Sequence, residues 1–312
     1  MTLGFIFSGQ GAQYQGMGKE FLEYSDIYAE KMTLASEILG YDVSQVIDDD
    51  VLLHQTEYTQ PAILAMSCAV SDMIKEELSI SPTMVAGLSL GEYTALVESG
   101  ALSFADALKI VQSRGKLMAE AVPKGVGAMS AIIGLDREIV LEACQEAQTC
   151  GVVIPANYNM PLQIAIAGEL PAVIEAERLL KDRGARRIIR LNVSGPFHTP
   201  LMQPAAEKLV PILERVTFQS PIIPVVTNVT GKVLTDDTSI VDNLMQQVMS
   251  PVYWEDGIQT MINHGVNTFV EIGPGKALSG FVKKIDKGVA VQNVDTIKTF
   301  EKLRQVLKNQ EA

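Results

Sequence analysis

The sequence predicts an α/β protein with an α/β-hydrolase-like core, built on a mostly parallel sheet, and a small inserted ferredoxin-like subdomain. Three observations lead to this fold class. Short apolar runs alternate with helical patterns in the first and last thirds of the chain. A Gly-x-Ser-x-Gly sequence follows one of these runs, and a β-α-β-β-α-β order occupies the middle. We therefore expect a core formed by residues 1–126 and 197–312, and a ferredoxin-like subdomain formed by residues 127–196.

The chain begins with an apolar run, Leu3 to Phe7, which predicts a buried strand. The glycine-rich loop Ser8 to Gln13 follows, and we expect a helix from this loop to about Leu39. A dinucleotide-binding fingerprint would need glycine where Tyr14 stands, so that function is excluded. Two interpretations of the loop remain. It is a plain βα turn, or its free backbone N–H groups hold an oxyanion.

The second strand leads into the most informative stretch of the sequence. Met84 to Ala86 reads as the end of a buried strand, and Leu90 to Glu98 as a helix, with Gly87-Leu88-Ser89-Leu90-Gly91 between them. This is the pattern of a nucleophile elbow, in which a strained serine stands at a sharp turn between neighbours that lack bulk. The alternative is a glycine-rich turn with an idle serine. A long apolar helix, Thr59 to Leu78, precedes the elbow strand.

The next helix carries a charge on its apolar face. Ser103 with Asp106 forms a variant of the capping box at its start. Arg114 falls within the apolar stripe, three residues after Val111 and four before Met118. Burying an unpaired charge costs several kcal/mol, so Arg114 needs a partner. It extends to solvent or pairs with a structural carboxylate, or else it binds an anionic substrate group, because guanidinium binds carboxylate bidentately.

The remaining elements complete the two units. The inserted subdomain is expected to contain the strands Ala128 to Leu135, Val152 to Ala156, Gln163 to Ala167 and Arg187 to Val193, with helices from Arg137 to Gln148 and from Ala172 to Arg183. In the last third we expect the strands Ile223 to Asn228, Lys232 to Thr235, Phe269 to Ile272 and Val289 to Val294. Helices are expected from Ser239 to Val248, from Trp254 to His264, from Lys276, and at the end to Lys308.

A serine nucleophile needs a base within hydrogen-bond reach, and the chain has three histidines. His54 lies in a polar loop and His264 at a helix end beside glycine. His198 lies in the rigid turn Ser194 to Pro200, where the chain returns from the subdomain to the core. Clefts form at such junctions, so His198 is the favoured base. A structural role remains the alternative for a single histidine.

Composition restricts the possible functions. The net charge is −12, which argues against a general nucleic-acid binder. No apolar stretch is long enough for a membrane span, and three irregularly spaced cysteines predict neither disulfides nor a zinc site. We expect a cytoplasmic protein in a reducing compartment. Two stretches could bind an acidic partner or could be ordinary solvated surfaces: Arg183, Arg186, Arg187 and Arg190, and Lys276, Lys283, Lys284 and Lys287.

Five motifs occur in an order that closely resembles the malonyl-CoA:acyl carrier protein transacylases of bacterial fatty acid synthesis. They are Phe5-Ile6-Phe7-Ser8-Gly9-Gln10-Gly11, Gly87-Leu88-Ser89-Leu90-Gly91-Glu92, Arg114-Gly115-Lys116, Gly195-Pro196-Phe197-His198 and Glu271-Ile272-Gly273-Pro274-Gly275. The resemblance covers essentially the whole chain, including the ferredoxin-like insertion. Each motif alone is weak, but five in order are specific. One position departs from the pattern, because many relatives have histidine where this chain has Leu88.

The resemblance implies a role for each motif. Ser89 would be the nucleophile and His198 its base, and the backbone N–H groups of Gln10 and Leu90 would form the oxyanion hole. Arg114 would hold the malonyl carboxylate. In this family a main-chain carbonyl, not an aspartate, orients the histidine.

By motif, the residue that supplies this carbonyl is Gln247. The resemblance further implies malonyl-CoA as substrate and an acidic acyl carrier protein as partner, docked on the local basic patches. It implies no metal or organic cofactor, no nucleic acid, no membrane, and a monomer.

Two other functions remain open. A thioesterase or other α/β hydrolase would use the same Ser-His pair, and would need an acidic third member between them in the chain. That residue would have to come from the inserted subdomain. A non-enzymatic scaffold that binds the carrier protein would have an unreactive Ser89.

Overall fold

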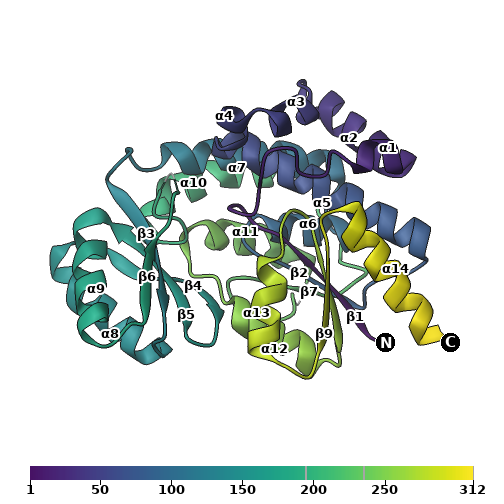
Figure 1. The fold of residues 1–312 in the computed structure, drawn as a ribbon. Helices are drawn as coiled ribbons and strands as arrows, with labels where there is room; N and C mark the ends of the chain where they lie inside the picture. The colour runs from purple at the N-terminus through teal and green to yellow at the C-terminus, as the bar shows by residue number, and fades with distance from the viewer. Residues whose placement is uncertain (194, 235, 312) are drawn as a thin grey trace.

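The computed structural model describes residues 1–193, 195–234 and 236–311. Two lobes lie side by side, each built around its own sheet (Figure 1). The larger lobe contains a five-stranded parallel sheet in the order β7-β2-β1-β8-β9. Its strands are β1 (Leu3–Phe7), β2 (Met84–Gly87), β7 (Val225–Val226), β8 (Thr268–Ile272) and β9 (Ala290–Val294). The predicted α/β class with a parallel sheet is confirmed.

Helices cover the parallel sheet on both sides, as the apolar composition of its strands requires. The N-terminal helices are α1 (Phe21–Tyr24), α2 (Asp26–Leu39), α3 (Val43–Asp48), α4 (Asp50–Leu53), α5 (Thr56–Leu78), α6 (Gly91–Glu98) and α7 (Phe104–Glu120). After the insertion come α10 (Gln203–Leu213), α11 (Ile240–Met249), α12 (Trp254–Asn263), α13 (Ala277–Ile285) and α14 (Ile297–Glu311). Among the residues with described positions, no helix is long and apolar enough to cross a bilayer.

The smaller lobe is a four-stranded antiparallel sheet in the order β4-β5-β3-β6. Its strands are β3 (Gly127–Ile133), β4 (Val153–Met160), β5 (Gln163–Glu169) and β6 (Arg187–Arg190). The helices α8 (Arg137–Ala147) and α9 (Leu170–Asp182) pack against this sheet around a separate cluster of buried side chains. This is the predicted ferredoxin-like arrangement. The two sheets support a division at residues 127 and 196, which we propose as the bounds of the subdomain.

The register of the parallel sheet brings three loops together. Phe7 at the end of β1 lies beside Gly87 at the end of β2 and beside Ile272 at the end of β8. The carboxyl ends of parallel strands face one edge of the sheet, which is where ligands bind in α/β proteins. The glycine-rich loop, the elbow and the Gly-Pro-Gly turn therefore share one edge.

The two lobes are joined firmly at the base of the smaller sheet. Arg137 of α8 forms ion pairs with Glu255 (2.7 Å) and Asp256 (2.8 Å) of α12. The rings of Tyr158 and Tyr253 stack at 5.1 Å, and the Tyr158 N–H donates to the Val252 carbonyl. These contacts cross the junction and fix how the subdomain faces the core.

Three predictions about local structure are wrong. The expected helix from the glycine-rich loop to Leu39 begins only at α1, because left-handed turns at Gly16 and Gly18 (φ 78° and 70°) interrupt it, and Ser25 separates α1 from α2. The expected strand from Ile223 to Asn228 has two residues.

Beyond that short strand, only a single antiparallel bridge from Val226 to Val233 stands where Lys232 to Thr235 was expected to be a strand. Thr235, at the end of that expected strand, and Ser194, in the expected turn, lie outside the described residues.

Candidate active site

The elbow between β2 and α6 places Ser89 in a left-handed backbone conformation, with φ at 51°. A Cβ on Gly87 would lie 1.9 Å from the carbonyl carbon of Gly91. A Cβ on Gly91 would lie 2.2 Å from the carbonyl oxygen of Phe7. Both glycines are therefore required by close backbone contacts, and the expected reason for the Gly-x-Ser-x-Gly pattern holds in this fold.

Asn228, two residues after the end of β7, holds the strained turn in place. Its side-chain Oδ1 accepts from the Ser89 N–H at 2.6 Å, and its Nδ2 donates to the Gly87 carbonyl at 2.7 Å. A left-handed non-glycine residue costs roughly 1–3 kcal/mol and persists only where its surroundings determine it. These two hydrogen bonds help to hold Ser89 in the left-handed conformation.

His198 lies within hydrogen-bond distance of the nucleophile. Its Nε2 is 2.8 Å from Ser89 Oγ, and its Nδ1 is 2.8 Å from the backbone carbonyl of Gln247. A carbonyl can only accept, so Nδ1 carries the proton and Nε2 is free to accept one from the serine. The other two histidines make helix-end contacts with the carbonyls of Asp50 and Thr260.

The surroundings of His198 keep it neutral. Burial, and after it the positive charge of Arg114, lower the pKa of the imidazole from 6.5 to about 4. Backbone hydrogen bonds with Gln247 and Ser250 oppose this shift. At neutral pH the ring is therefore unprotonated, as a general base must be.

Arg114 projects from α7 into the same site and is 1 % exposed. Its Nη1 donates to Gln60 Oε1 (2.9 Å), and its Nη2 donates to Gln247 Oε1 (3.0 Å) and to Ser89 Oγ (3.1 Å). It neither reaches solvent nor pairs with a carboxylate of the described residues. The guanidinium thus lies beside the nucleophile with only neutral partners.

Gln10 and Leu90 are the two predicted oxyanion donors. Neither backbone N–H donates to an acceptor within the described part of the chain. The Gln10 side chain is held by Gln60 and Thr56, at 3.0 Å and 3.3 Å. A Cβ on Gly9 would lie 2.5 Å from the Leu88 carbonyl oxygen, so the loop that carries Gln10 packs directly on the elbow.

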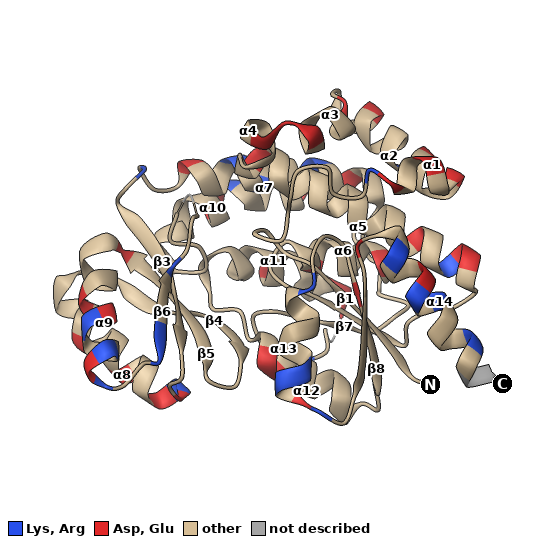
Figure 2. Cartoon of the chain, in the orientation of Figure 1, with Lys and Arg blue, Asp and Glu red and all other residues tan. Residues whose placement is uncertain are grey.

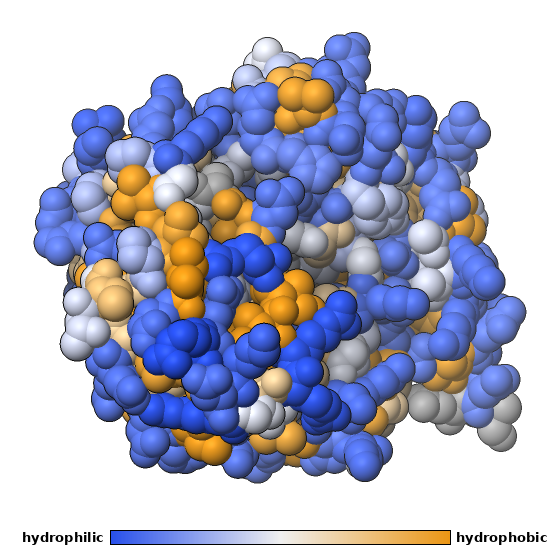
Figure 3. Space-filling model, turned by 60° about the vertical axis from the view of Figure 1, so that its left-hand side comes forward, coloured by the Kyte–Doolittle hydropathy of each residue, from blue (hydrophilic) through white to orange (hydrophobic). Residues whose placement is uncertain are grey.

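These residues line a cleft of about 460 Å³ between the two lobes. Leu88 lines it beside Ser89. The smaller lobe contributes Met129, Asn157, Asn159 and Ala165, and the connection back to the core contributes Leu191, Asn192, Val193 and Phe197. A view turned toward the smaller lobe shows apolar side chains in several separate patches among hydrophilic ones (Figure 3).

Sequence reasoning missed four residues that support this site. Gln60, Glu92, Asn228 and Asn243 are polar side chains bonded to it or to one another. Glu92 is fully buried. Burial raises the pKa of its carboxyl group, and hydrogen bonds from Gln247, Asn228 and Asn243 oppose that shift. Gln60 and Glu92 could have been found as Arg114 was, as polar residues inside apolar helical stretches.

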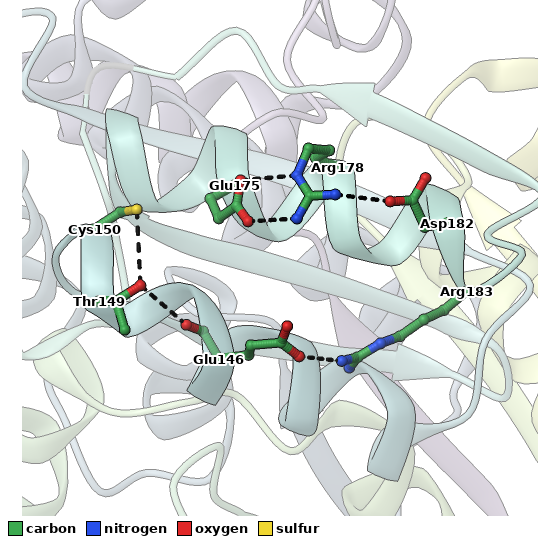
Figure 4. Close-up of polar contacts among 7 residues, drawn as sticks. All are labelled: Glu146, Thr149, Cys150, Glu175, Arg178, Asp182 and Arg183. Atoms are coloured by element: carbon green, nitrogen blue, oxygen red, sulfur yellow. Dashed lines mark hydrogen bonds and ion pairs between the residues drawn. The ribbon is translucent and has the colours of Figure 1, made fainter.

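The two basic stretches differ in how many charges they leave unpaired. Lys and Arg lie on β6 and around α13 (Figure 2). Arg190 is paired with Glu177 and Arg183 with Glu146. Arg183 points to Glu146, and Arg178 lies between Glu175 and Asp182, on the outer helices of the smaller lobe (Figure 4). In the described chain, the residues of these stretches without an ion pair are Arg186, Arg187, Lys276, Lys283, Lys284 and Lys287.

In residues 1–193, 195–234 and 236–311, no three His, Cys, Asp or Glu residues are placed to hold a metal ion.

The chain matches the model of the acyl transferase domain over residues 4–311. It is 43% identical to the malonyl CoA-acyl carrier protein transacylase of Bacillus subtilis, over 99% of this chain and 98% of that protein. A crystal structure of the Clostridium perfringens malonyl CoA-acyl carrier protein transacylase is 45% identical, with a TM-score of 0.97 over 100% of this chain and 98% of that one.

A third relative was solved in complex with a protein partner. It is the malonyl-transacylase of a complex with a type II PKS acyl-carrier protein, and it is 38% identical, with a TM-score of 0.95 over 99% of this chain and 100% of that one. The chain belongs to the acyl transferase domain family and, within it, to the malonyl CoA-acyl carrier protein transacylases.

Proposed function

We propose that this protein moves a malonyl group from malonyl-CoA to the phosphopantetheine thiol of an acyl carrier protein, through a malonyl ester on Ser89. The transfer supplies the extension units of fatty acid synthesis. The observation that carries the proposal is the position of Ser89 Oγ, 2.8 Å from His198 Nε2 and 3.1 Å from Arg114 Nη2. A nucleophile, a neutral base and a cation without a carboxylate partner meet at one atom.

In the first step, Ser89 Oγ attacks the thioester carbonyl carbon while its proton passes to His198 Nε2. The backbone N–H groups of Gln10 and Leu90 donate hydrogen bonds to the carbonyl oxygen and stabilise the negative charge that forms on it. One such donor typically raises the rate by about 10²- to 10³-fold. The tetrahedral intermediate then collapses. The C–S bond breaks, and the CoA sulfur accepts the proton from His198 Nε2, which leaves malonyl-Ser89 and free CoA.

In the second step, the carrier-protein thiol gives its proton to His198 Nε2 and attacks the ester carbonyl carbon. The same N–H groups hold the oxyanion. Collapse breaks the bond to Ser89 Oγ, which recovers its proton from His198. The carbonyl of Gln247 keeps Nδ1 protonated through both steps, so Nε2 alternates between accepting and donating.

Arg114 selects the acyl group. A malonyl chain on Ser89 carries a carboxylate, and the Nη2 group that contacts Ser89 Oγ is placed to receive it. An acetyl group offers no charge to the guanidinium, so the buried cation gains no ionic partner from it. This difference favours malonyl over uncharged acyl groups.

The hydrolase alternative lacks its acidic third member. The partner of His198 Nδ1 is a backbone carbonyl, and no carboxylate of the described residues bonds to that ring. A hydrolase would release free malonate steadily without a carrier, whereas the proposed enzyme holds its acyl group until a thiol arrives. An assay of malonate release without carrier protein separates the two.

The acidic carrier protein is proposed to dock on the cations that have no ion pair in the described chain. These lie on both lobes, with Arg186 and Arg187 at β6 and Lys276, Lys283 and Lys284 at α13. One relative of the same fold was solved with its carrier protein bound. We also place the reaction in the cytoplasm, since Cys68, Cys144 and Cys150 are free thiols.

The test is detection of the acyl-enzyme by intact-mass spectrometry after mixing with malonyl-CoA. We expect one malonyl group per chain on the wild-type protein and none on Ser89→Ala, which should unfold at an unchanged temperature. A matched control is Ser113→Ala, on the surface side of α7, which should label fully. Normal labelling of Ser89→Ala would refute the proposal, and an unreactive wild-type protein that still binds carrier would favour a scaffold.

A further inference from the structure

A buried carboxylate lies behind the catalytic residues and takes no part in the proposed chemistry. Glu92, in the first turn of α6, contacts neither Ser89 Oγ nor the His198 ring. We infer that Glu92 is a positioning residue, which fixes the orientation of the Gln247 amide and of Asn228 and thereby holds base, cation and nucleophile in register. This inference rests on the proposed function, since it assumes that Ser89 and His198 react.

The first line of support is the direction of the Gln247 amide. Gln247 Nε2 lies 2.8 Å from Glu92 Oε2 and 3.0 Å from the Ser89 carbonyl oxygen. Both atoms can only accept, so the amide must present its NH₂ group to them. Its oxygen then faces Arg114 Nη2 at 3.0 Å. With the amide reversed, N–H would face N–H at the arginine, and oxygen would face oxygen at the glutamate.

Gln247 also positions the base, His198. It lies in the last turn of α11, where backbone carbonyls have no helical partner, and its carbonyl accepts from His198 Nδ1 at 2.8 Å. One residue therefore holds Arg114 with its side chain and His198 with its main chain. Glu92 is the anchor that keeps that residue in a single arrangement.

A second branch runs from Glu92 to the nucleophile. Glu92 Oε2 also accepts from the backbone N–H of Asn228 at 3.1 Å. Asn228 in turn bonds the Ser89 N–H and the Gly87 carbonyl. The left-handed conformation of Ser89 thus depends on an asparagine whose own backbone is fixed by the same carboxylate.

Asn243 makes the third contact with the Glu92 carboxylate. Asn243, one turn before Gln247 on α11, donates from Nδ2 to Glu92 Oε1 at 2.6 Å. The three partners of Glu92 among the described residues are N–H donors, so both of its carboxyl oxygens act as acceptors. A buried network that is fully satisfied specifies one geometry, and a partly satisfied one does not.

The experiment is rapid-quench measurement of Ser89 acylation by malonyl-CoA, in which amplitude and rate constant are read separately. The amplitude reports the fraction of folded, labelled protein, and the rate constant reports the geometry of the site. We expect Glu92→Ala to keep its amplitude per folded chain and to lower the rate constant by about 10- to 100-fold, since a misplacement of 1 Å can cost on the order of 10²-fold. Glu92→Gln should recover most of the loss, because its amide oxygen can accept from Gln247 and Asn228.

The matched control is Glu98→Ala, on the same helix. Its side chain is 4 % exposed, bonds Ser71 and Lys75, and has no bond to the site within the described residues. It should acylate at the wild-type rate constant. If Glu92→Ala fails to fold, Gln247→Met tests the same connection, because it removes the amide and keeps the backbone carbonyl; it should show the same reduction.

The outcomes separate the inference from the proposed function. If the wild-type protein and Glu98→Ala acylate Ser89 while Glu92→Ala, or Gln247→Met in its place, does so at an unchanged rate constant, the positioning role is overturned and the function stands. A lower amplitude at an unchanged rate constant likewise shows a role in folding only. If the wild-type protein forms no ester on Ser89, the function fails, and the inference fails with it.

Discussion

Replacing Arg114 by methionine tests the selectivity of the site most sharply. The guanidinium is fully buried, and its partners Gln60, Gln247 and Ser89 are all neutral. No carboxylate of the described residues forms an ion pair with it, so a bound malonyl carboxylate would supply that partner. Removing one member of such a buried pair costs about 3–5 kcal/mol. At 1.4 kcal/mol per tenfold, this corresponds to a loss of roughly 10²- to 4 × 10³-fold in kcat/KM for malonyl-CoA.

The assay compares malonyl-CoA with acetyl-CoA at equal concentration, with transfer to carrier protein as the readout. Acetyl transfer serves as the internal measure of folding, because it uses the same serine and base without needing the charge. We expect malonyl transfer to fall by the stated factor while acetyl transfer stays equal or rises. Lys116→Met, an exposed cation two residues along α7, should leave both rates unchanged. An unchanged malonyl-to-acetyl ratio in Arg114→Met would refute the assigned role.

Three further predictions follow from the same geometry. The base must be neutral and His198 has a pKa of about 4, so kcat/KM should stay constant as the pH falls below 6.5 and decline only toward pH 4. Arg114→Met removes one cause of the lowered pKa, so the decline in this variant should begin at a higher pH. A decline at the same or a lower pH would contradict this explanation. Gly91→Ala places a Cβ 2.2 Å from a backbone oxygen and should lower the free energy of unfolding by at least about 1–3 kcal/mol. The control Gly280→Ala, in open space on α13, should raise the free energy of unfolding by about 0.5–1 kcal/mol. Equal melting temperatures for the two variants would count against the elbow packing. Lys283→Glu should raise KM for carrier protein and leave KM for malonyl-CoA unchanged, with a difference that shrinks as salt is added; salt-independent kinetics would exclude this docking surface.

The backbone of the site could be predicted because local chemistry determines it. The strand, the two glycines and the following helix occur within a few residues, and close backbone contacts at Gly87 and Gly91 demand those residue types. Arg114 could be identified for a similar reason, because a charged residue within the apolar stripe of a helix stands out in the local sequence. The order of strands in the smaller lobe likewise follows from the sequence of its elements.

Long-range partners could not be predicted in the same way. Residue types and helical spacing do not reveal that Asn228 holds the Ser89 amide from 139 residues away. Nor do they show that Glu92 bonds Gln247, 155 residues away. The role of Gln247 came only through family resemblance, because a backbone carbonyl leaves no mark in side-chain composition.

The helix expected up to Leu39 failed for a different reason. Turns at Gly16 and Gly18 use left-handed conformations that a hydrophobic pattern does not record. A Cβ on Gly18 would lie 2.2 Å from the Tyr28 hydroxyl oxygen, so tertiary packing sets the path of that segment. Local pattern was overridden by a contact with a helix further along the chain.

The most direct test of malonyl transfer through one serine is a chase of the isolated acyl-enzyme. The protein is loaded with malonyl-CoA, freed of CoA by gel filtration, and mixed with holo-acyl carrier protein in a quench-flow instrument. We predict that the ester on Ser89 disappears and malonyl-carrier protein appears with the same rate constant, one for one, with no free malonate. An ester that persists while carrier protein is malonylated from fresh malonyl-CoA would contradict the account.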